Sequence, residues 1–87
     1  MFYVSKKMNS EDVTTLLEKT LVGCQIEVDS QGSHFNVLVV GDLFKGKRAV
    51  QRQQLIYAVL NESISSGAIH AVNMKLFTPQ EWLHRTQ

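Results

Sequence analysis

Hydrophobic residues in the first part of the chain recur every three or four positions, which is the spacing of one face of an α-helix. Ser10 is a residue type suited to the N-cap, and the acids Glu11 and Asp12 follow where the helix dipole favours them. Gly23 stands where a C-cap would end the helix. The pattern predicts a helix between Ser10 and Gly23, with an apolar stripe of Val13, Leu16, Leu17 and Leu21.

The period then changes to strict alternation, which is typical of half-buried β-strands. A first strand is predicted around Cys24, Ile26 and Val28, and a second from His34 to Val40. On the second strand one face carries Phe35, Val37 and Val39, and the other carries His34, Asn36, Leu38 and Val40. The short segment Ser30-Gln31-Gly32-Ser33 is predicted to be the turn of an antiparallel hairpin.

A loop and a long helix follow the hairpin. The loop runs from Gly41 to Arg48, and the segment from Ala49 to Ile64 lacks Gly and Pro, which favours a helix. Ser65-Ser66-Gly67 is predicted to end it. The apolar stripe assigned to this helix is Val50, the aliphatic part of Gln53, Tyr57, Leu60 and Ile64, with Ile56 beside it.

The last part of the chain predicts a third strand and a short helix. The strand runs from Ile69 to Phe77, with Val72, Met74 and Leu76 on one face beside His70. Thr78-Pro79-Gln80-Glu81 has the form of a capping box with proline at the first helical position, and it begins a helix that carries Trp82.

These elements predict an α+β domain of order α-β-β-α-β-α, in which helices cover one side of a three-stranded mixed sheet. Residues 1–9 show no clear period and are interpreted as a flexible N-terminal arm, which leaves residues 10–87 as a single domain. A chain of 87 residues has no room for a second core.

Composition narrows the class of protein. Net charge is +1, which is too balanced for a protein that strongly attracts nucleic acids or membranes. The single cysteine, Cys24, excludes an intramolecular disulfide and any zinc site that needs two thiolates from this chain. The longest apolar run, Leu55 to Leu60, is too short to span a bilayer. We therefore expect a cytoplasmic protein that does not associate with membranes.

Templates for enzyme active sites fit the sequence poorly. The segment from Gly41 through Gly46-Lys47 has the glycine and lysine spacing of a phosphate-binding loop, but Arg48 replaces the Ser or Thr that would bind magnesium. No nucleophile and base dyad is visible along the chain. The sequence therefore predicts a protein that is not an enzyme.

Histidines are the main candidates for chemistry. His34 begins the second predicted strand, His70 lies near the start of the third, and His84 lies in the last helix. If the second and third strands run parallel, the sheet is mixed, and His34 and His70 share one rim, where two imidazoles suit zinc, copper or iron but leave it under-coordinated. The alternative is that His70 is a core-edge histidine bonded to a carbonyl, and spacing alone favours it. Cys24 alternates with apolar residues and is expected to be buried and inert.

The only basic cluster consists of Lys45, Lys47, Arg48 and Arg52. Arg48 and Arg52 are four residues apart and share a face at a helix N-terminus, a geometry that suits phosphate. The alternative is an ordinary solvated surface. The balanced net charge predicts at most weak, salt-sensitive affinity for nucleic acid.

A set of short segments, in order and spacing, resembles the BolA family and most closely its short bacterial branch, the IbaG or YrbA type. The resemblance runs from about Ser10 to Trp82. It rests on Gly32-Ser33-His34-Phe35, Val37 to Val40, Phe44-Lys45-Gly46, Gln51-Arg52-Gln53-Gln54, Ile69-His70-Ala71-Val72 and Thr78-Pro79-Gln80-Glu81-Trp82. It implies a fold like a type II K homology domain.

The resemblance also implies a function. Family members pair with monothiol glutaredoxins that carry a Cys-Gly-Phe-Ser motif, and the heterodimer holds a bridging 2Fe–2S cluster together with glutathione. The family's ligand histidine falls on His70. The second ligand lies in the loop between strands one and two, which here has no Cys or His, so His34 is the nearest candidate and Cys24 a more distant one. No cofactor is expected to bind tightly to the isolated chain, which is expected to be a monomer or weak dimer.

Two alternative functions stay open. Some family members are described as transcription regulators that contact DNA, but Gln53-Gln54 stands where many have His-Arg, which removes a positive charge. A stress-responsive scaffold in which histidines titrate is the third hypothesis. On the leading hypothesis, iron–sulfur cluster assembly and iron homeostasis, the last helix with Trp82 and the basic loop would contact the glutaredoxin.

Overall fold

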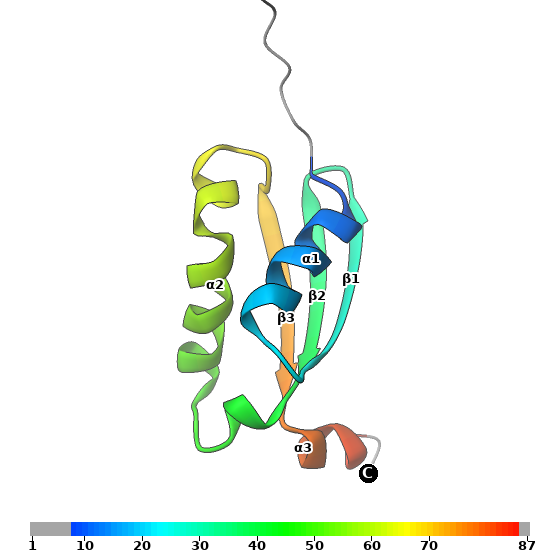
Figure 1. Ribbon diagram of the computed structural model, residues 1–87, viewed down its shortest axis with the longest axis vertical. Helices are drawn as coiled ribbons and strands as arrows, with labels where there is room; N and C mark the ends of the chain where they lie inside the picture. Colours follow the sequence, from blue (N-terminus) through cyan, green and yellow to red (C-terminus); the bar gives the residue numbers. More distant parts are fainter. Residues whose placement is uncertain (1–7, 86–87) are drawn as a thin grey trace, which may run out of the picture.

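The computed structural model describes residues 8–85, so most of the predicted N-terminal arm, residues 1–7, lies outside the described residues. Figure 1 shows helices α1 and α2 beside one small sheet and α3 at the end of β3. The order of elements agrees with the prediction. The elements are α1 (Ser10–Thr20), β1 (Gln25–Gln31), β2 (His34–Val40), the 3-10 turn η1 (Asp42–Phe44), α2 (Ala49–Ser65), β3 (Ala71–Phe77) and α3 (Pro79–Leu83).

The sheet has the order β1-β2-β3 and is mixed. β1 pairs with β2 antiparallel, and β2 pairs with β3 parallel, with His34 opposite Ala71 and Val40 opposite Phe77. The parallel pair needs a crossover, and α2 supplies it along β3 (Figure 1). The predicted three-stranded mixed sheet is confirmed.

Helices α1 and α2 cover one face of the sheet. Alternate residues of β2 point into the core, and Phe35, Val37 and Val39 are at most 2% exposed. They pack with α1 residues such as Leu17 and α2 residues such as Leu60. Each large apolar side chain that is fully buried contributes about 1.5–3 kcal/mol of transfer free energy. The other face carries polar residues of β1 and β2 and is open, as the alternation predicted.

The buried face of α2 differs from the prediction. Ile56 and Leu60 are fully buried, whereas Val50 is 62% exposed and Tyr57 is 46% exposed. Apolar residues occur around more than half of this helix, so its period alone does not select one face. Packing against β3 and α1 selects the row through Ile56 and Leu60, and leaves Val50 and Tyr57 in solvent.

The first helix begins one residue earlier than expected. Asn9 is the N-cap instead of Ser10, because its side chain accepts the Asp12 N–H at 2.8 Å while the Asp12 carboxylate accepts the Asn9 N–H at 3.1 Å. Met8 packs against the core. Met8 and Asn9, which the sequence assigned to the arm, therefore belong to the folded domain.

The hairpin turn is shorter than expected. Gln31 still pairs with His34, so only Gly32 and Ser33 form the turn instead of the four residues from Ser30 to Ser33. Gly32 has φ +61° and Ser33 has no positive φ, a combination found in type II′ hairpin turns. This tight turn places Ser33 directly beside the start of β3, where its carbonyl accepts two backbone hydrogen bonds.

Candidate functional site

His70 lies at the rim of the sheet, in the residue before β3. The strand was expected to begin at Ile69, but the Ile69 N–H bonds the Ser63 carbonyl of α2, and the sheet begins at Ala71. The backbone N–H of His70 donates to the Ser33 carbonyl at 2.9 Å. His70 is therefore attached to the hairpin turn by its own main chain.

The imidazole of His70 is exposed and is held at one nitrogen. Its Nδ1 lies 2.9 Å from the Ser33 hydroxyl oxygen. No described residue forms a hydrogen bond with Nε2. The core-edge alternative is wrong for this histidine, because the side chain is exposed and its partner is a hydroxyl instead of a carbonyl. His70 thus presents one ring nitrogen to solvent.

His34 lies at the same rim, as expected for parallel strands. Its Cα pairs with that of Ala71, the residue after His70. Because Phe35 points into the core, alternation places His34 on the open face, and it is exposed. Ser33 and His70 each stand one residue before the pair of His34 and Ala71, so alternation directs their side chains to the opposite face, the one that the helices cover. The rim therefore brings His34 and His70 into adjacent positions without directing both rings to the same face. His84 lies at the end of α3, beyond the other end of the sheet.

Cys24 lies far from the histidines. It precedes β1 beside Gly41, and the strands of seven residues place it about 20 Å along the sheet from the histidine rim. It is half-buried. Burial and the nearby Asp42 carboxylate both raise the pKa of the Cys24 thiol, which disfavours the thiolate that binds metals. The structure does not bring Cys24 together with His70.

The donor set of the described residues fits a shared metal centre better than a resident one. Within residues 8–85 no group of three or more His, Cys, Asp or Glu side chains is placed to hold a metal ion. The exposed Nε2 of His70 is a suitable imidazole donor for iron. A cluster held here therefore needs most of its ligands from another molecule.

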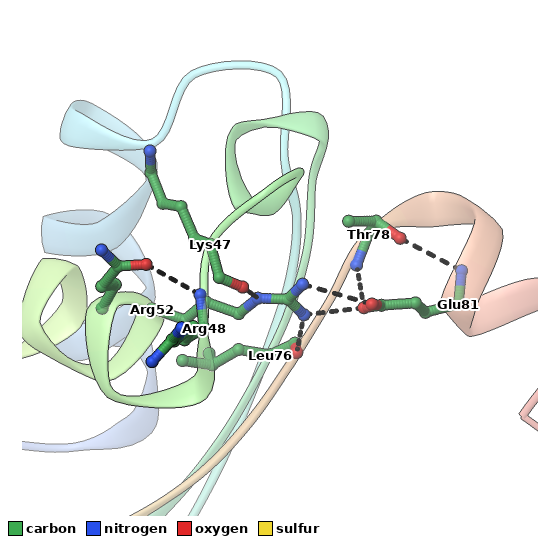
Figure 2. A network of polar contacts seen from close by, with 7 residues as sticks. Lys47, Arg48, Arg52, Leu76, Thr78 and Glu81 are labelled. Carbon is green, nitrogen blue, oxygen red and sulfur yellow. Dashed lines mark hydrogen bonds and ion pairs between the residues drawn. The ribbon is translucent and has the colours of Figure 1, made fainter.

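The basic residues lie at the opposite end of the sheet, and Arg52 is not free there. Figure 2 shows its guanidinium donating to the Lys47 carbonyl at 2.9 Å, to the Leu76 carbonyl at 3.1 Å, and to both carboxylate oxygens of Glu81 at 2.7 and 3.2 Å. Its side chain is 14% exposed and lies over the Phe44 ring. Arg52 therefore joins α2, β3 and α3, and its charge is paired within the fold.

Glu81 completes this junction through the predicted capping box. Its carboxylate accepts the Thr78 N–H at 2.9 Å, and the Thr78 hydroxyl accepts the Glu81 N–H at 3.2 Å. The hydrogen bond from Arg52 is the largest of the effects that lower the pKa of Glu81 to about 2, and the Thr78 backbone bond adds to it. The Arg52–Glu81 pair joins residues 29 positions apart, and no local sequence pattern indicates it.

Lys45, Lys47 and Arg48 are exposed cations of the loop before α2 at this end. Arg48 is the residue before α2, and its N–H is capped by the Gln51 side chain. Lys75 of β3, which the sequence analysis did not select, lines a groove together with Lys47 and Arg52. The basic surface is therefore built from loop cations and Lys75, with Arg52 beneath it.

Trp82 also lies at this end, against Phe77. The two ring centroids are 5.4 Å apart, and the Arg85 guanidinium lies 3.6 Å from the centroid of the indole ring. Figure 1 shows α3 at one end of β3, and His70 precedes the other end of that strand. The length of the sheet therefore separates His70 from the residues expected to contact a partner, which are Lys45, Lys47, Arg48, Arg52 and Trp82. No described helix is long and apolar enough to cross a membrane.

Comparison with known proteins identifies the family that the chain matches. The sequence profile of BolA-like proteins matches residues 8–81. The chain is 40% identical over 75 residues to the acid stress protein IbaG of Escherichia coli, covering 86% of this chain and 89% of that protein. A match of 50% identity over 50 residues to the DNA-binding transcriptional regulator BolA of Haemophilus influenzae covers 58% of this chain and 48% of that protein.

A solved structure supports the fold. The BolA domain of SufE1 from Arabidopsis thaliana is similar with a TM-score of 0.77 at 30% identity, covering 88% of this chain and 99% of that domain. The profile match begins at Met8, which agrees with the packing of Met8 against the core.

Proposed function

The chain belongs to the BolA-like family, and we propose that it is a non-enzymatic cytoplasmic adaptor that pairs with a monothiol glutaredoxin. The heterodimer would hold a bridging 2Fe–2S cluster for iron–sulfur cluster assembly or transfer and for iron homeostasis. The glutaredoxin cysteine and a glutathione thiolate would bind one iron. This chain would supply an imidazole to the other.

One observation carries the proposal: the exposed His70 imidazole, whose Nε2 has no partner among the described residues. An isolated imidazole is a poor metal site, but it is well suited to a cluster whose other ligands come from a partner. The cluster, when bound, supplies electron-transfer and iron-donating chemistry. His70 of this chain would hold one iron through its exposed imidazole.

The position of His70 defines the docking surface. Because the cluster bridges both proteins, the glutaredoxin has to approach the rim formed by Ser33, His34 and His70. The basic loop and Trp82 lie about 20 Å away along the strands. We therefore propose that the main contact is at the histidine rim, and that the opposite end contacts the partner only if its surface extends along the sheet.

The test is anaerobic cluster reconstitution with a monothiol glutaredoxin and glutathione, followed by visible circular dichroism and size-exclusion chromatography. The wild-type protein is expected to give a spectrum distinct from that of the glutaredoxin homodimer and a heterodimer peak. His70→Ala is expected to lose both the spectrum and the peak, whereas His84→Ala, a matched exposed histidine, retains them. A wild-type mixture with only the homodimer spectrum and no complex contradicts the proposal.

His34 is the candidate for the second protein ligand. His34 pairs across the strands with Ala71, the residue that follows His70. Its side chain points to the open face of the sheet. His34→Ala is expected to weaken the mixed cluster without abolishing it. Abolition equal to that in His70→Ala would make His34 an obligatory ligand.

A DNA-binding regulator is the second candidate function. The exposed Lys45, Lys47 and Arg48 and the name of the Haemophilus relative favour it. Because Arg52 is paired with Glu81, the four cations of the basic surface, Lys45, Lys47, Arg48 and Lys75, remain for phosphates. They predict a slope of about −4 in log K against log salt concentration. Binding that lacks sequence preference and disappears at physiological salt would remove this function.

A further inference from the structure

Ser33 contacts His70 twice, by its main chain and by its side chain. Resting on the proposed role of His70 as an iron ligand, we propose that Ser33 is a positioning residue that holds the imidazole in the tautomer with the proton on Nδ1. This tautomer leaves the Nε2 lone pair free. Nε2 is then the atom of this chain that binds iron.

Backbone hydrogen bonds and the tight hairpin turn both position the Ser33 hydroxyl beside the His70 ring. The Ser33 carbonyl accepts the N–H groups of His70 and Ala71 at 2.9 and 3.4 Å. The two-residue turn, with Gly32 at φ +61°, leaves Ser33 immediately before β2. The backbones of Ser33 and His70 are thus joined, and the Ser33 hydroxyl oxygen is held 2.9 Å from Nδ1.

This hydrogen bond has two possible directions, with different consequences for metal binding. If Nδ1–H donates to the hydroxyl oxygen, Nε2 carries a lone pair, and the serine proton points to solvent. If the hydroxyl donates to Nδ1, Nε2 carries the proton and cannot bind iron. A histidine that binds a metal usually donates its other ring N–H to an oxygen acceptor, and a serine hydroxyl has lone pairs for this purpose.

Position also favours Nε2 over Nδ1 as the ligand atom. Nδ1 faces the Ser33 hydroxyl at hydrogen-bond distance, so a metal could reach it only by displacing the serine. The ring as a whole is exposed, and no described residue bonds Nε2. The contact therefore leaves Nε2 as the nitrogen that a metal can reach, and the proposed proton on Nδ1 gives that nitrogen its free lone pair.

The first test needs no cluster. Long-range proton–nitrogen NMR of the isolated protein at a pH of about 8.5, above the usual titration range of histidine, reads the tautomer of each imidazole. His70 is expected to show mainly the Nδ1–H form. In Ser33→Ala it is expected to shift towards the pattern of the exposed His84, and in Ser33→Thr, which keeps the hydroxyl, it is expected to stay like the wild type.

A wild-type His70 that is mainly Nε2–H, or a tautomer unchanged in Ser33→Ala, overturns the inference. Urea denaturation of both variants checks that the fold is intact. If Ser33→Ala fails to fold, Ser33→Cys replaces it as a variant of similar size with a much weaker hydrogen-bonding group.

The second test separates this inference from the proposed function. In the reconstitution with glutaredoxin, Ser33→Ala is expected to lower the stability of the mixed cluster about tenfold, because loss of an outer hydrogen bond typically costs about 10–100-fold in metal affinity. A wild-type protein that forms the mixed cluster, together with an unaffected Ser33→Ala, overturns the role of Ser33 alone. A wild-type protein that forms none overturns the proposed function, and the NMR result then decides the tautomer by itself.

Discussion

At the end of the sheet where β3 begins, His70 is exposed and has one ring nitrogen without a partner among the described residues. At the end where β3 finishes, Arg52 is 14% exposed and uses its guanidinium in four hydrogen bonds. We call the first the histidine end (Ser33, His34, His70) and the second the arginine end (Arg52, Leu76, Glu81). Both residues belong to types that bind ligands, but only His70 remains available.

Residue type and spacing are therefore not enough to identify a binding group. Arginine has five donor hydrogens in a planar fork, which suits backbone carbonyls and a carboxylate as well as it suits phosphate. Here two carbonyls and the Glu81 carboxylate occupy the fork. The arginine end therefore stabilises the fold, while the histidine end is free to bind.

The largest expected effect is the difference in stability between removing the Arg52 side chain and removing the His70 side chain. Arg52→Ala is expected to lower the free energy of unfolding by about 2–3 kcal/mol, because two backbone carbonyls and a carboxylate lose a charged donor. His70→Ala is expected to change it by less than about 0.5 kcal/mol, as exposed positions usually do. Urea denaturation measures both. Arg52→Lys is the matched control and recovers only part of the loss, since an ammonium group cannot reproduce the fork. Equal stability of the Arg52 and His70 variants would refute the comparison.

A second test concerns close packing beside the arginine end. Gly41 donates its N–H to the Phe77 carbonyl, and a Cβ added to it would overlap the Cys24 sulfur atom. Gly41→Ala is therefore expected to destabilise the fold by about 2 kcal/mol through overpacking. Adding Cys24→Ala removes the sulfur and is expected to restore part of this loss in a double-mutant cycle. Additive effects of the two substitutions would show that the contact does not limit stability.

The acid sensitivity of the arginine end gives a third, smaller effect. The pKa of Glu81 falls from 4.5 to about 2 on folding, chiefly through the hydrogen bond from Arg52. Since the folded pKa is the lower one, this contribution to stability is complete above about pH 4.5 and is lost as the pH falls towards 2. Glu81→Gln is expected to flatten the stability profile in this interval and to leave its shape between about pH 5 and 8 unchanged.

That same profile tests the acid-responsive hypothesis. Glu81 does not titrate between about pH 5 and 8, so a slope in that range would indicate the histidines, which usually titrate there. If His34→Ala or His70→Ala abolished that slope, the result would support a pH-sensing role for the histidine end. A flat profile would leave no basis for such a role.

The smallest effect is expected on the exposed cations. Each single replacement of Lys45, Lys47 or Arg48 with Ala is expected to change the free energy of unfolding by less than about 0.5 kcal/mol. If the protein binds DNA, each substitution is expected to reduce the salt slope by about 0.9. Arg52→Lys should have little effect on that slope. A large effect of Arg52→Lys would mean that Arg52 contacts phosphate despite its pairing with Glu81.

The parts of the fold that depend on local physics were predictable. Strand β2 was assigned from His34 to Val40 because its alternation is regular, and the capping box at Thr78 and Glu81 forms as expected. The prediction was wrong where neighbouring residues compete for a role. Asn9 replaces Ser10 as the N-cap, and Ile56 is buried instead of Val50 and Tyr57. In these cases several residues are locally suitable, and tertiary packing selects among them.

Periodicity and short ordered motifs were enough to predict the order of elements and the family, and the same motifs indicated His70 as a candidate ligand. Four features depend on packing and were visible only in the structure. Ser33 bonds His70, the His34 side chain points to the open face, Cys24 lies at the far end of the sheet, and Arg52 pairs with Glu81. Hydrogen bonds and ion pairs act over about 3–4 Å in space, whatever the separation along the chain. Which residues become partners therefore depends on how the strands and helices pack.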